Sequence, residues 1–122
     1  MSEPRVFSPL GEHCLAEAWG LSEARLREPT WLTKRFAELL RAADFTVLHE
    51  HVERFPEPGG GFTAFFVLSE SHASAHSYPE HGYLALDLFS CGPRPTRAVI
   101  EALLQELSPS RSSINIIVRG QS

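Results

Sequence analysis

The segment GYLALDLF, residues 82–89, alternates two sets of side chains with a period of two. One set is Leu84, Leu86 and Leu88, and the other set is Tyr83, Ala85, Asp87 and Phe89. Successive side chains of a β-strand point to opposite faces of a sheet, so this pattern predicts a strand with one wholly apolar face. A leucine face of this kind has to be covered by a second layer of structure.

Four further segments predict strands. They are residues 13–19, a stretch from residue 45 towards residue 55, residues 62–68 and residues 114–118. Residues 56–61, PEPGGG, predict a tight turn, because proline fixes one backbone angle and glycine supplies the others. We therefore expect the two strands that flank this turn to form a hairpin.

Two amphipathic helices are predicted to cover the sheet. The first is expected to begin with Thr30 as its N-cap and to end near Asp44, and the second is expected to begin near Pro95. Their apolar stripes are Leu32, Phe36, Leu39, Leu40 and Ala43 in the first helix and Val99, Ile100, Leu103, Leu104 and Leu107 in the second. Ser22 is expected to cap a short helical turn through Arg27. Strands with one buried face and two main helices on that face predict an α+β fold, a two-layer sandwich with a mostly antiparallel sheet.

Length and composition indicate a single domain that spans residues 1–122. The chain has 43% hydrophobic and 21% charged residues, which is typical of a globular protein. Its net charge is -4 and it contains no run of Lys or Arg, so we expect no nucleic-acid partner. It shows no signal-peptide pattern and no apolar run long enough to span a bilayer, so we expect no membrane association and a cytoplasmic location. Without a secretory context, Cys14 and Cys91 are expected to be free thiols.

The stretch VLSESHASAHSYPE, residues 67–80, is the part of the sequence that points to chemistry. A polar turn with isolated histidines is the plain alternative. A zinc site formed by His72, His76 and His81 is a second alternative, but the alternation of Ser and Ala favours extended chain, in which only the first two share a face. A serine hydrolase is a weaker alternative, because Ser71 does not lie in a G-x-S-x-G turn. We expect no metal ion.

Three segments of the chain match one known family. They are LGEHCLAEAWG (residues 10–20), GFTAFFVLSESHASAHSYPEHGY (residues 61–83) and ALDLFSCG (residues 85–92). The core of the match is the pattern ES-H-x-S-x-H-x-x-P-E, followed by Cys91 twenty residues after Ser71. In these segments the sequence resembles the small bacterial and archaeal S-adenosylmethionine decarboxylases, which are made as proenzymes and cleave themselves.

The resemblance implies cleavage of the peptide bond between Glu70 and Ser71. The hydroxyl of Ser71 would attack the carbonyl of Glu70 and convert the amide into an ester. Elimination and hydrolysis would then leave a pyruvoyl group derived from Ser71. Residues 1–70 would become the β chain and residues 71–122 the α chain.

Three further residues match family positions with roles in the chemistry. Thr63 and His76 match the positions that assist cleavage, where a hydroxyl polarises the carbonyl and an imidazole moves protons. Cys91 matches the catalytic proton donor, which returns a proton to Cα after carbon dioxide leaves. For Cys14 we expect only a buried structural role.

A pyruvoyl group suits a decarboxylase, because the loss of carbon dioxide leaves electrons at Cα that need a sink. A pyruvoyl ketone forms a Schiff base with the substrate amine and withdraws those electrons, as pyridoxal phosphate does in other enzymes. A pyridoxal enzyme needs a buried lysine, whereas Lys34, the single lysine of this chain, lies outside the apolar stripe of its predicted helix. A cofactor made from the chain itself is therefore the better fit.

The resemblance also suggests residues that bind the substrate. Glu80 and Glu17 match positions where a carboxylate holds a ribose or offsets a substrate cation, and Phe55 is placed like an aromatic residue that stacks on adenine. A solvated charge is the alternative for both carboxylates, and a core position is the alternative for Phe55. A structural role is open for Asp87.

The family activity implies decarboxylation of S-adenosylmethionine for spermidine synthesis by a homodimer of processed protomers. This chain has Ala73 and Ala75 where the family usually has bulky aliphatic residues, and Phe62 where it has a small one. A pyruvoyl-dependent arginine or ornithine decarboxylase of the same fold is therefore an alternative. A non-catalytic paralogue and a metal-binding module are two further alternatives.

Overall fold

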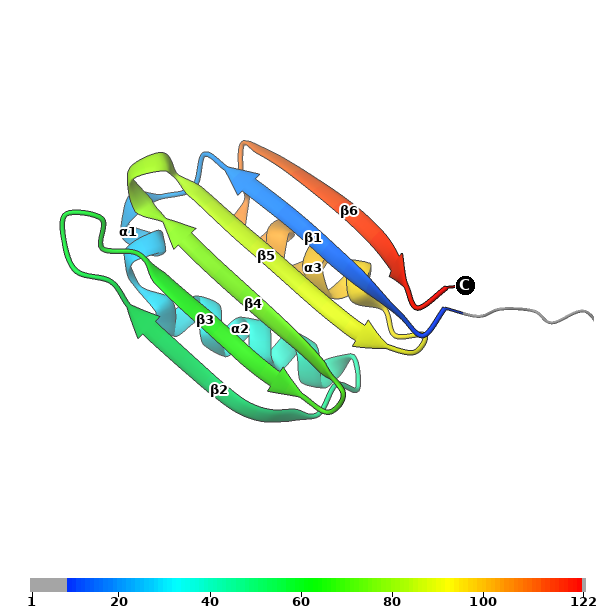
Figure 1. Cartoon of the computed structure of the whole chain (residues 1–122). Helices are drawn as coiled ribbons and strands as arrows, with labels where there is room; N and C mark the ends of the chain where they lie inside the picture. Colours follow the sequence, from blue (N-terminus) through cyan, green and yellow to red (C-terminus); the bar gives the residue numbers. More distant parts are fainter. Residues whose placement is uncertain (1–8, 122) are drawn as a thin grey trace, which may run out of the picture.

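The structure is a computed structural model that describes residues 9–121. In chain order its elements are β1 (Gly11–Trp19), α1 (Glu23–Arg27), α2 (Pro29–Ala42), β2 (Val47–Arg54), β3 (Phe62–Leu68), β4 (Ser71–Tyr78), the 3₁₀ turn η1 (Pro79–His81), β5 (Tyr83–Cys91), α3 (Thr96–Leu107) and β6 (Arg111–Arg119). The strands form one sheet in the order β2-β3-β4-β5-β1-β6, and every neighbouring pair is antiparallel. The helices lie on one face of this sheet (Figure 1), which confirms the predicted two-layer α+β sandwich. Within the described residues, no helix combines the length and the apolar character that crossing a membrane requires.

The core lies between the helices and the inner face of the sheet. Phe36 of α2 and Phe66 of β3 are completely buried there, with their ring centroids 5.1 Å apart. β4 contributes the small side chains of Ala73 and Ala75 to this layer, so the large aromatic rings have space beside it. The leucine face predicted for β5 is buried in the same layer, which confirms the prediction from the alternating pattern.

The start of α2 differs from the prediction. The N-cap is Glu28 rather than Thr30, and Pro29 occupies the first helical position. Proline already has the backbone angle of a helix, and its missing N–H would have no partner at that position, so the helix begins before Thr30. At α1 the predicted cap is confirmed, because Ser22 Oγ accepts a hydrogen bond from the backbone N–H of Arg25 at 3.3 Å.

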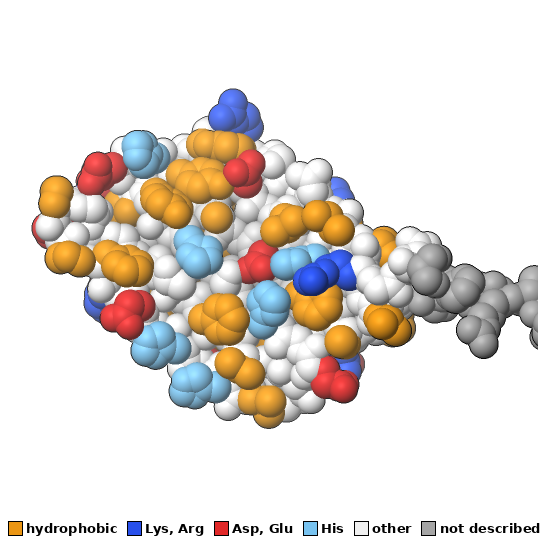
Figure 2. Space-filling view, viewed as in Figure 1, with side chains coloured by type: hydrophobic (Ala, Val, Ile, Leu, Met, Phe, Trp, Pro, Cys, Tyr) orange, Lys and Arg blue, Asp and Glu red, His pale blue; other side chains and the backbone are white. Residues whose placement is uncertain are grey.

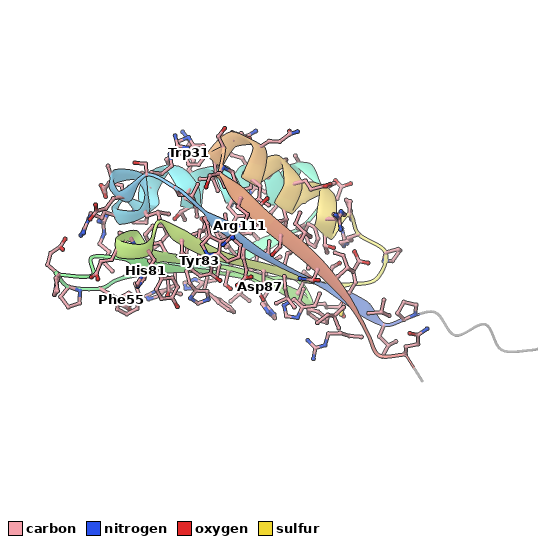
Figure 3. All side chains as sticks on the ribbon, turned by 90° about the horizontal axis from the view of Figure 1, so that it is seen from above. Trp31, Phe55, His81, Tyr83, Asp87 and Arg111 are labelled. Carbon is pink, nitrogen blue, oxygen red and sulfur yellow. The ribbon has the colours of Figure 1, made fainter. Side chains whose placement is uncertain are left out.

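The other face of the sheet is not covered by any helix of residues 9–121, and we call it the open face. Figure 2 shows this face, where histidine and hydrophobic side chains gather over the strands. Figure 3 places Asp87 on the side of the sheet away from the helices. Phe65 and Val67 of β3 are each 40% exposed on this face, and Ile117 of β6 is 49% exposed. Exposed apolar side chains gathered on one face are typical of a surface that contacts another protein layer.

Candidate active site

The predicted cleavage site lies in the tight turn between β3 and β4. The register pairs Leu68 with Ser71, so Ser69 and Glu70 form the two-residue loop of the hairpin. Glu70 has a φ of 60°, in the left-handed region that costs a residue with a side chain about 1–2 kcal/mol. The backbone is therefore strained immediately before the Glu70–Ser71 peptide bond, on an exposed turn.

The hydroxyl of Ser71 is held against the end of β5. Its Oγ accepts a hydrogen bond from the backbone N–H of Cys91 at 3.0 Å. In the register of β4 and β5, His72 pairs with Phe89. This register brings Ser71 and Cys91 together, although twenty positions of sequence separate them. Cys91 is exposed at the end of its strand. We call Glu70, Ser71 and Cys91 the turn end of the site.

A second group of predicted residues gathers around one cavity of about 370 Å³, which Thr63, His76, Phe55 and Glu80 all line. Thr63 and His76 pair in the β3–β4 register, and Thr63 Oγ1 lies 3.1 Å from His76 Nδ1. Gly61 lets the predicted turn approach β4 closely, because a Cβ there would lie 2.3 Å from a backbone oxygen of that strand. We call Thr63, His76, Phe55 and Glu80 the histidine end of the site.

Glu17 lies on another side of His76. Its carboxylate accepts a hydrogen bond from the hydroxyl of Tyr83 at 2.6 Å. Burial, together with this hydrogen bond, raises the pKa of Tyr83 to about 12. Glu17, Tyr83 and His76 line a separate cavity of about 370 Å³. Glu17 is therefore near the histidine end but does not line the cavity shared by Phe55 and Glu80.

The turn end and the histidine end are far apart within one chain. Ser71 begins β4 and His76 lies five residues further along, which corresponds to about 16 Å at the rise of a β-strand. The alternation of the strand also directs the two side chains to opposite faces of the sheet. The structure thus brings Ser71 to Cys91 and Thr63 to His76, but one chain does not bring these two pairs together.

Asp87 is the centre of a polar cluster that the sequence analysis did not predict. Its Oδ1 accepts a hydrogen bond from Ser74 Oγ, and its Oδ2 lies 2.6 Å from Nε2 of His13 and 3.4 Å from Nε2 of His72. Ser74 Oγ in turn lies 3.3 Å from Nε2 of His76. The available sequence signal was an acidic residue on the outer face of an apolar strand.

The zinc site considered from the sequence is not assembled. Among the described residues, His72 belongs to a group of potential metal ligands, but His76 and His81 do not. The partners of His72 in this group are His13 and Asp87, and the donor atoms of the three residues lie within 4.8 Å of one another. Two ligands of a tetrahedral zinc ion lie about 3.3 Å apart at ordinary bond lengths. The 2.6 Å contact between His13 and Asp87 is a hydrogen bond instead.

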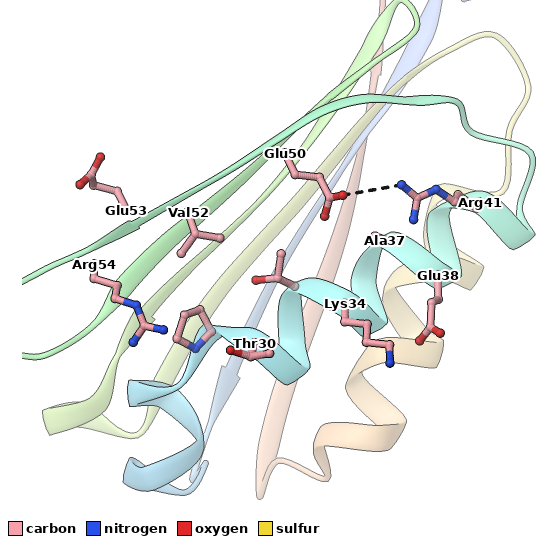
Figure 4. A pocket seen from close by; sticks show the side chains of 11 residues that line it. Thr30, Lys34, Ala37, Glu38, Arg41, Glu50, Val52, Glu53 and Arg54 are labelled. Atoms are coloured by element: carbon pink, nitrogen blue, oxygen red, sulfur yellow. Dashed lines mark ion pairs between the residues drawn. The ribbon is translucent and has the colours of Figure 1, made fainter.

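A larger cavity of about 760 Å³ lies between α2 and β2 (Figure 4). Its walls carry charged side chains from both elements, including Arg41 and Glu50, which form an ion pair at 3.6 Å. It contains none of the residues predicted to carry chemistry. Lys34 lines it and is exposed, so the single lysine is not buried as a pyridoxal enzyme would require.

The two cysteines differ in their surroundings, although both are free as predicted. Cys14 is completely buried, and burial raises the pKa of its thiol to about 11. A thiol in this state is a poor nucleophile and a poor acid near neutral pH. The buried structural position expected for Cys14 is confirmed, whereas Cys91 is accessible to a small molecule.

The chain matches the sequence model of a known protein family over a range that contains both ends of the candidate site. The sequence model described as "S-adenosylmethionine decarboxylase" matches residues 12–120. This range contains the turn end, the histidine end and nearly all of the described chain. The chain belongs to the S-adenosylmethionine decarboxylase family.

Individual members of the S-adenosylmethionine decarboxylase family match over most of their length. The chain is 34% identical over 115 residues to the S-adenosylmethionine decarboxylase proenzyme of Brevibacillus brevis. This match covers 93% of this chain and 85% of the relative. The chain is 32% identical over 106 residues to the proenzyme of Pyrobaculum aerophilum, and this match covers 86% of this chain and 84% of the relative. The crystal structure of the adenosylmethionine decarboxylase from Aquifex aeolicus matches with a TM-score of 0.82 and 27% identity, over 93% of each chain. The resemblance noted in the sequence is therefore confirmed.

Proposed function

We propose that this chain is a proenzyme that cuts itself between Glu70 and Ser71 and then decarboxylates S-adenosylmethionine. The observation that carries the proposal is the turn end, where a strained residue precedes the serine and the serine hydroxyl lies beside the backbone of Cys91. Membership of the S-adenosylmethionine decarboxylase family supports the same activity. The product would supply aminopropyl groups for spermidine synthesis, and the cytoplasmic location stays a prediction.

The proposed cleavage begins at the hydroxyl of Ser71. Its oxygen attacks the carbonyl carbon of Glu70, the C–N bond breaks, and the amide becomes an ester with a free α-amino group. Loss of the Cα proton of Ser71 then expels the carboxylate of Glu70. Water releases ammonia from the remaining group and leaves a ketone. Residues 1–70 form the β chain, and residues 71–122 form the α chain with a pyruvoyl group at its start.

The residues near the two ends have separate tasks in decarboxylation. The pyruvoyl group supplies the sink for the electrons that remain at Cα when carbon dioxide leaves. Cys91 is exposed next to Ser71, which suits a thiol that returns a proton to Cα. Phe55 and Glu80 line one cavity and would hold the adenine and the ribose, while Glu17 would offset the positive charge of the substrate.

A homodimer follows from the separation of the two ends. Within one chain about 16 Å of strand separates Ser71 from His76, so the histidine end can act on the cleavage site only if a second copy supplies it. The exposed side chains of Phe65, Val67 and Ile117 offer an apolar surface on the open face for this contact. In the proposed dimer two open faces meet. The partner's His76 then approaches the Glu70–Ser71 bond at the exposed turn, which lies at the end of the sheet, although the Ser71 hydroxyl itself points to the other face.

The residues that depart from the family pattern bear on the choice of substrate. Ala73 and Ala75 are completely buried in the layer under the helices and do not line the cavity of the histidine end. Phe62 borders this cavity, but its side chain is 1% exposed. The cavity itself offers Phe55 and Glu80, which suit a substrate with a flat base and a ribose. These features favour S-adenosylmethionine over arginine or ornithine.

Two measurements on the purified protein test the proposal. Denaturing electrophoresis should show two fragments, and borohydride should trap a ketone on the α fragment. Release of carbon dioxide should then be measured with S-adenosylmethionine, arginine and ornithine in separate reactions, and we expect release from the first alone. A single intact chain with no activity would favour a non-catalytic paralogue. Release from arginine or ornithine alone would contradict the proposed substrate.

A further inference from the structure

A chain of side-chain hydrogen bonds runs across the open face from Asp87 to Thr63. Ser74 Oγ bonds to Oδ1 of Asp87 and lies 3.3 Å from Nε2 of His76, and Nδ1 of the same ring lies 3.1 Å from Thr63 Oγ1. The four residues come from the neighbouring strands β3, β4 and β5. Ser74 is only 5% exposed, so water has little access to replace its partners.

The direction of each proton in this chain follows from the donors and acceptors available. A carboxylate only accepts, so the single proton of the Ser74 hydroxyl points to Asp87. The oxygen of Ser74 can then only accept from His76, which requires a proton on Nε2. In a neutral imidazole the other nitrogen, Nδ1, carries no proton and accepts from the hydroxyl of Thr63.

Asp87 is held from its other side as well. Its Oδ2 lies 2.6 Å from Nε2 of His13 and 3.4 Å from Nε2 of His72. The ring of His72 stacks on Phe65, with centroids 5.6 Å apart and an interplanar angle of 13°. These two contacts are made to Oδ2, so Oδ1 is left for the hydroxyl of Ser74.

We propose that Asp87 is a positioning residue that acts through Ser74 to hold His76 in the tautomer with its proton on Nε2. The bare Nδ1 is then a base beside the hydroxyl of Thr63, whereas a protonated Nδ1 would be only a donor. The inference rests on the proposed role of Thr63 and His76 in cleavage. The tautomer itself can be observed in a chain that does not cut.

The tautomer is measured by ¹⁵N NMR of the histidine side chains in the full-length Ser71→Ala protein, which we expect to stay intact. Spectra are recorded in alkaline buffer, where the neutral ring is observed, and the signals of His76 are assigned by their loss in His76→Gln. We expect a protonated Nε2 and a bare Nδ1. Adding Ser74→Ala should shift the ring towards the Nδ1-protonated form, and Ser74→Thr, which keeps the hydroxyl, should retain the parent tautomer.

His13→Gln is the matched control, because it removes a different contact of Asp87 and leaves Ser74 in place. We expect the tautomer of His76 to stay unchanged in this variant. A protonated Nδ1 in the Ser71→Ala parent would overturn the inference. Retention of the parent tautomer in Ser74→Ala would overturn it equally.

Cleavage kinetics test the functional half of the inference with Ser71 present. Ser74→Ala should slow cleavage by at least about tenfold, since proton transfer by a positioned group contributes a factor of this size or more. Ser74→Thr should cleave at close to the original rate. A normal rate in Ser74→Ala, with the tautomer changed, would show that the positioning does not serve cleavage. A parent protein that never cuts would contradict the proposed function, while the NMR result would still decide the tautomer.

Discussion

The two ends of strand β4 are held in different ways. At the turn end, Glu70 and Cys91 are exposed, and Ser71 is held by a hydrogen bond from a backbone N–H. At the histidine end, Thr63 and His76 are half-buried and belong to a continuous network of side-chain hydrogen bonds. The turn end is therefore defined by backbone conformation, and the histidine end by its neighbouring side chains. The proposed cleavage and the proposed base would need these different surroundings, one for a bond that breaks and one for a group that stays in place.

The position of the turn also explains how the fold can tolerate a cut. β4 pairs with β3 on one side and with β5 on the other. Breaking the bond between Glu70 and Ser71 opens a two-residue loop without removing a strand from the sheet. We expect the cut protein to keep its sheet, since the backbone hydrogen bonds of both ladders remain paired.

The largest expected effect is at the turn end. Ser71→Ala removes the attacking oxygen, so the chain should stay uncut and inactive, as judged by denaturing electrophoresis and release of carbon dioxide. Ser69→Ala is the matched control, because it changes the other serine of the same turn, and it should cut normally. A cut Ser71→Ala protein would remove Ser71 as the nucleophile.

The second prediction tests whether the two ends meet between chains. His76→Ala and Ser71→Ala should each stay uncut when expressed alone. When they are co-expressed with different tags, the His76→Ala chain should be cut, because a mixed dimer joins its Ser71 to an intact histidine end. If the site were complete within one chain, the His76→Ala chain would stay whole in the mixture.

The third prediction separates cutting from turnover. Cys91→Ala should still cut, but release of carbon dioxide should fall by about 100-fold or more, because the protonating group is lost. Cys14→Ala is the control, since that thiol is buried away from the site and should leave turnover unchanged. Undiminished turnover in Cys91→Ala would exclude Cys91 as the proton donor.

The smallest expected effect concerns Glu17 and Tyr83, beside the histidine end. Ultraviolet titration of Tyr78→Phe protein, in which Tyr83 is the one remaining tyrosine, should give a pKa of Tyr83 raised above the ordinary 10.0. Glu17→Gln should lower this pKa without reaching the ordinary 10.0, because burial is the larger cause of the shift and the hydrogen bond is the smaller one. An unchanged pKa would show that the Glu17–Tyr83 pair does not form in solution.

The sign of the accompanying stability change follows from the same shift. The folded state favours the neutral phenol of Tyr83, so its contribution to stability is complete below pH 10.0 and is lost as the pH rises through about 12. Urea unfolding at several alkaline pH values should show a shallower loss of stability in Tyr83→Phe than in the parent. An equally steep loss in both proteins would contradict the assignment.

Much of the fold could be predicted from the sequence, because periodicity reports which face of an element is buried. The alternation in β5 and the apolar stripes of α2 and α3 were sufficient for the two layers. The predicted start of α2 was wrong, because the backbone preference of Pro29 outweighed the capping side chain of Thr30. The placement of β1 between β5 and β6 was not predicted, since alternation carries no information on strand order.

The candidate site was predicted as a list of residues rather than as an arrangement. The sequence already favoured extended chain between Ser71 and His76, so their separation of about 16 Å could have been calculated from it. The proposed positioning role of Asp87 could not have been predicted, because it depends on the register that pairs Asp87 with Ser74 across β4 and β5. Register is set by the whole sheet and not by the local pattern.

Intact-mass spectrometry of the purified wild-type protein tests the central claim most directly. The account predicts two polypeptides, residues 1–70 and residues 71–122. The second should be lighter, by the mass of one ammonia, than the same fragment with a serine at its start. A single polypeptide with the mass of the complete chain, or a second fragment with an unmodified serine at its start, would contradict it.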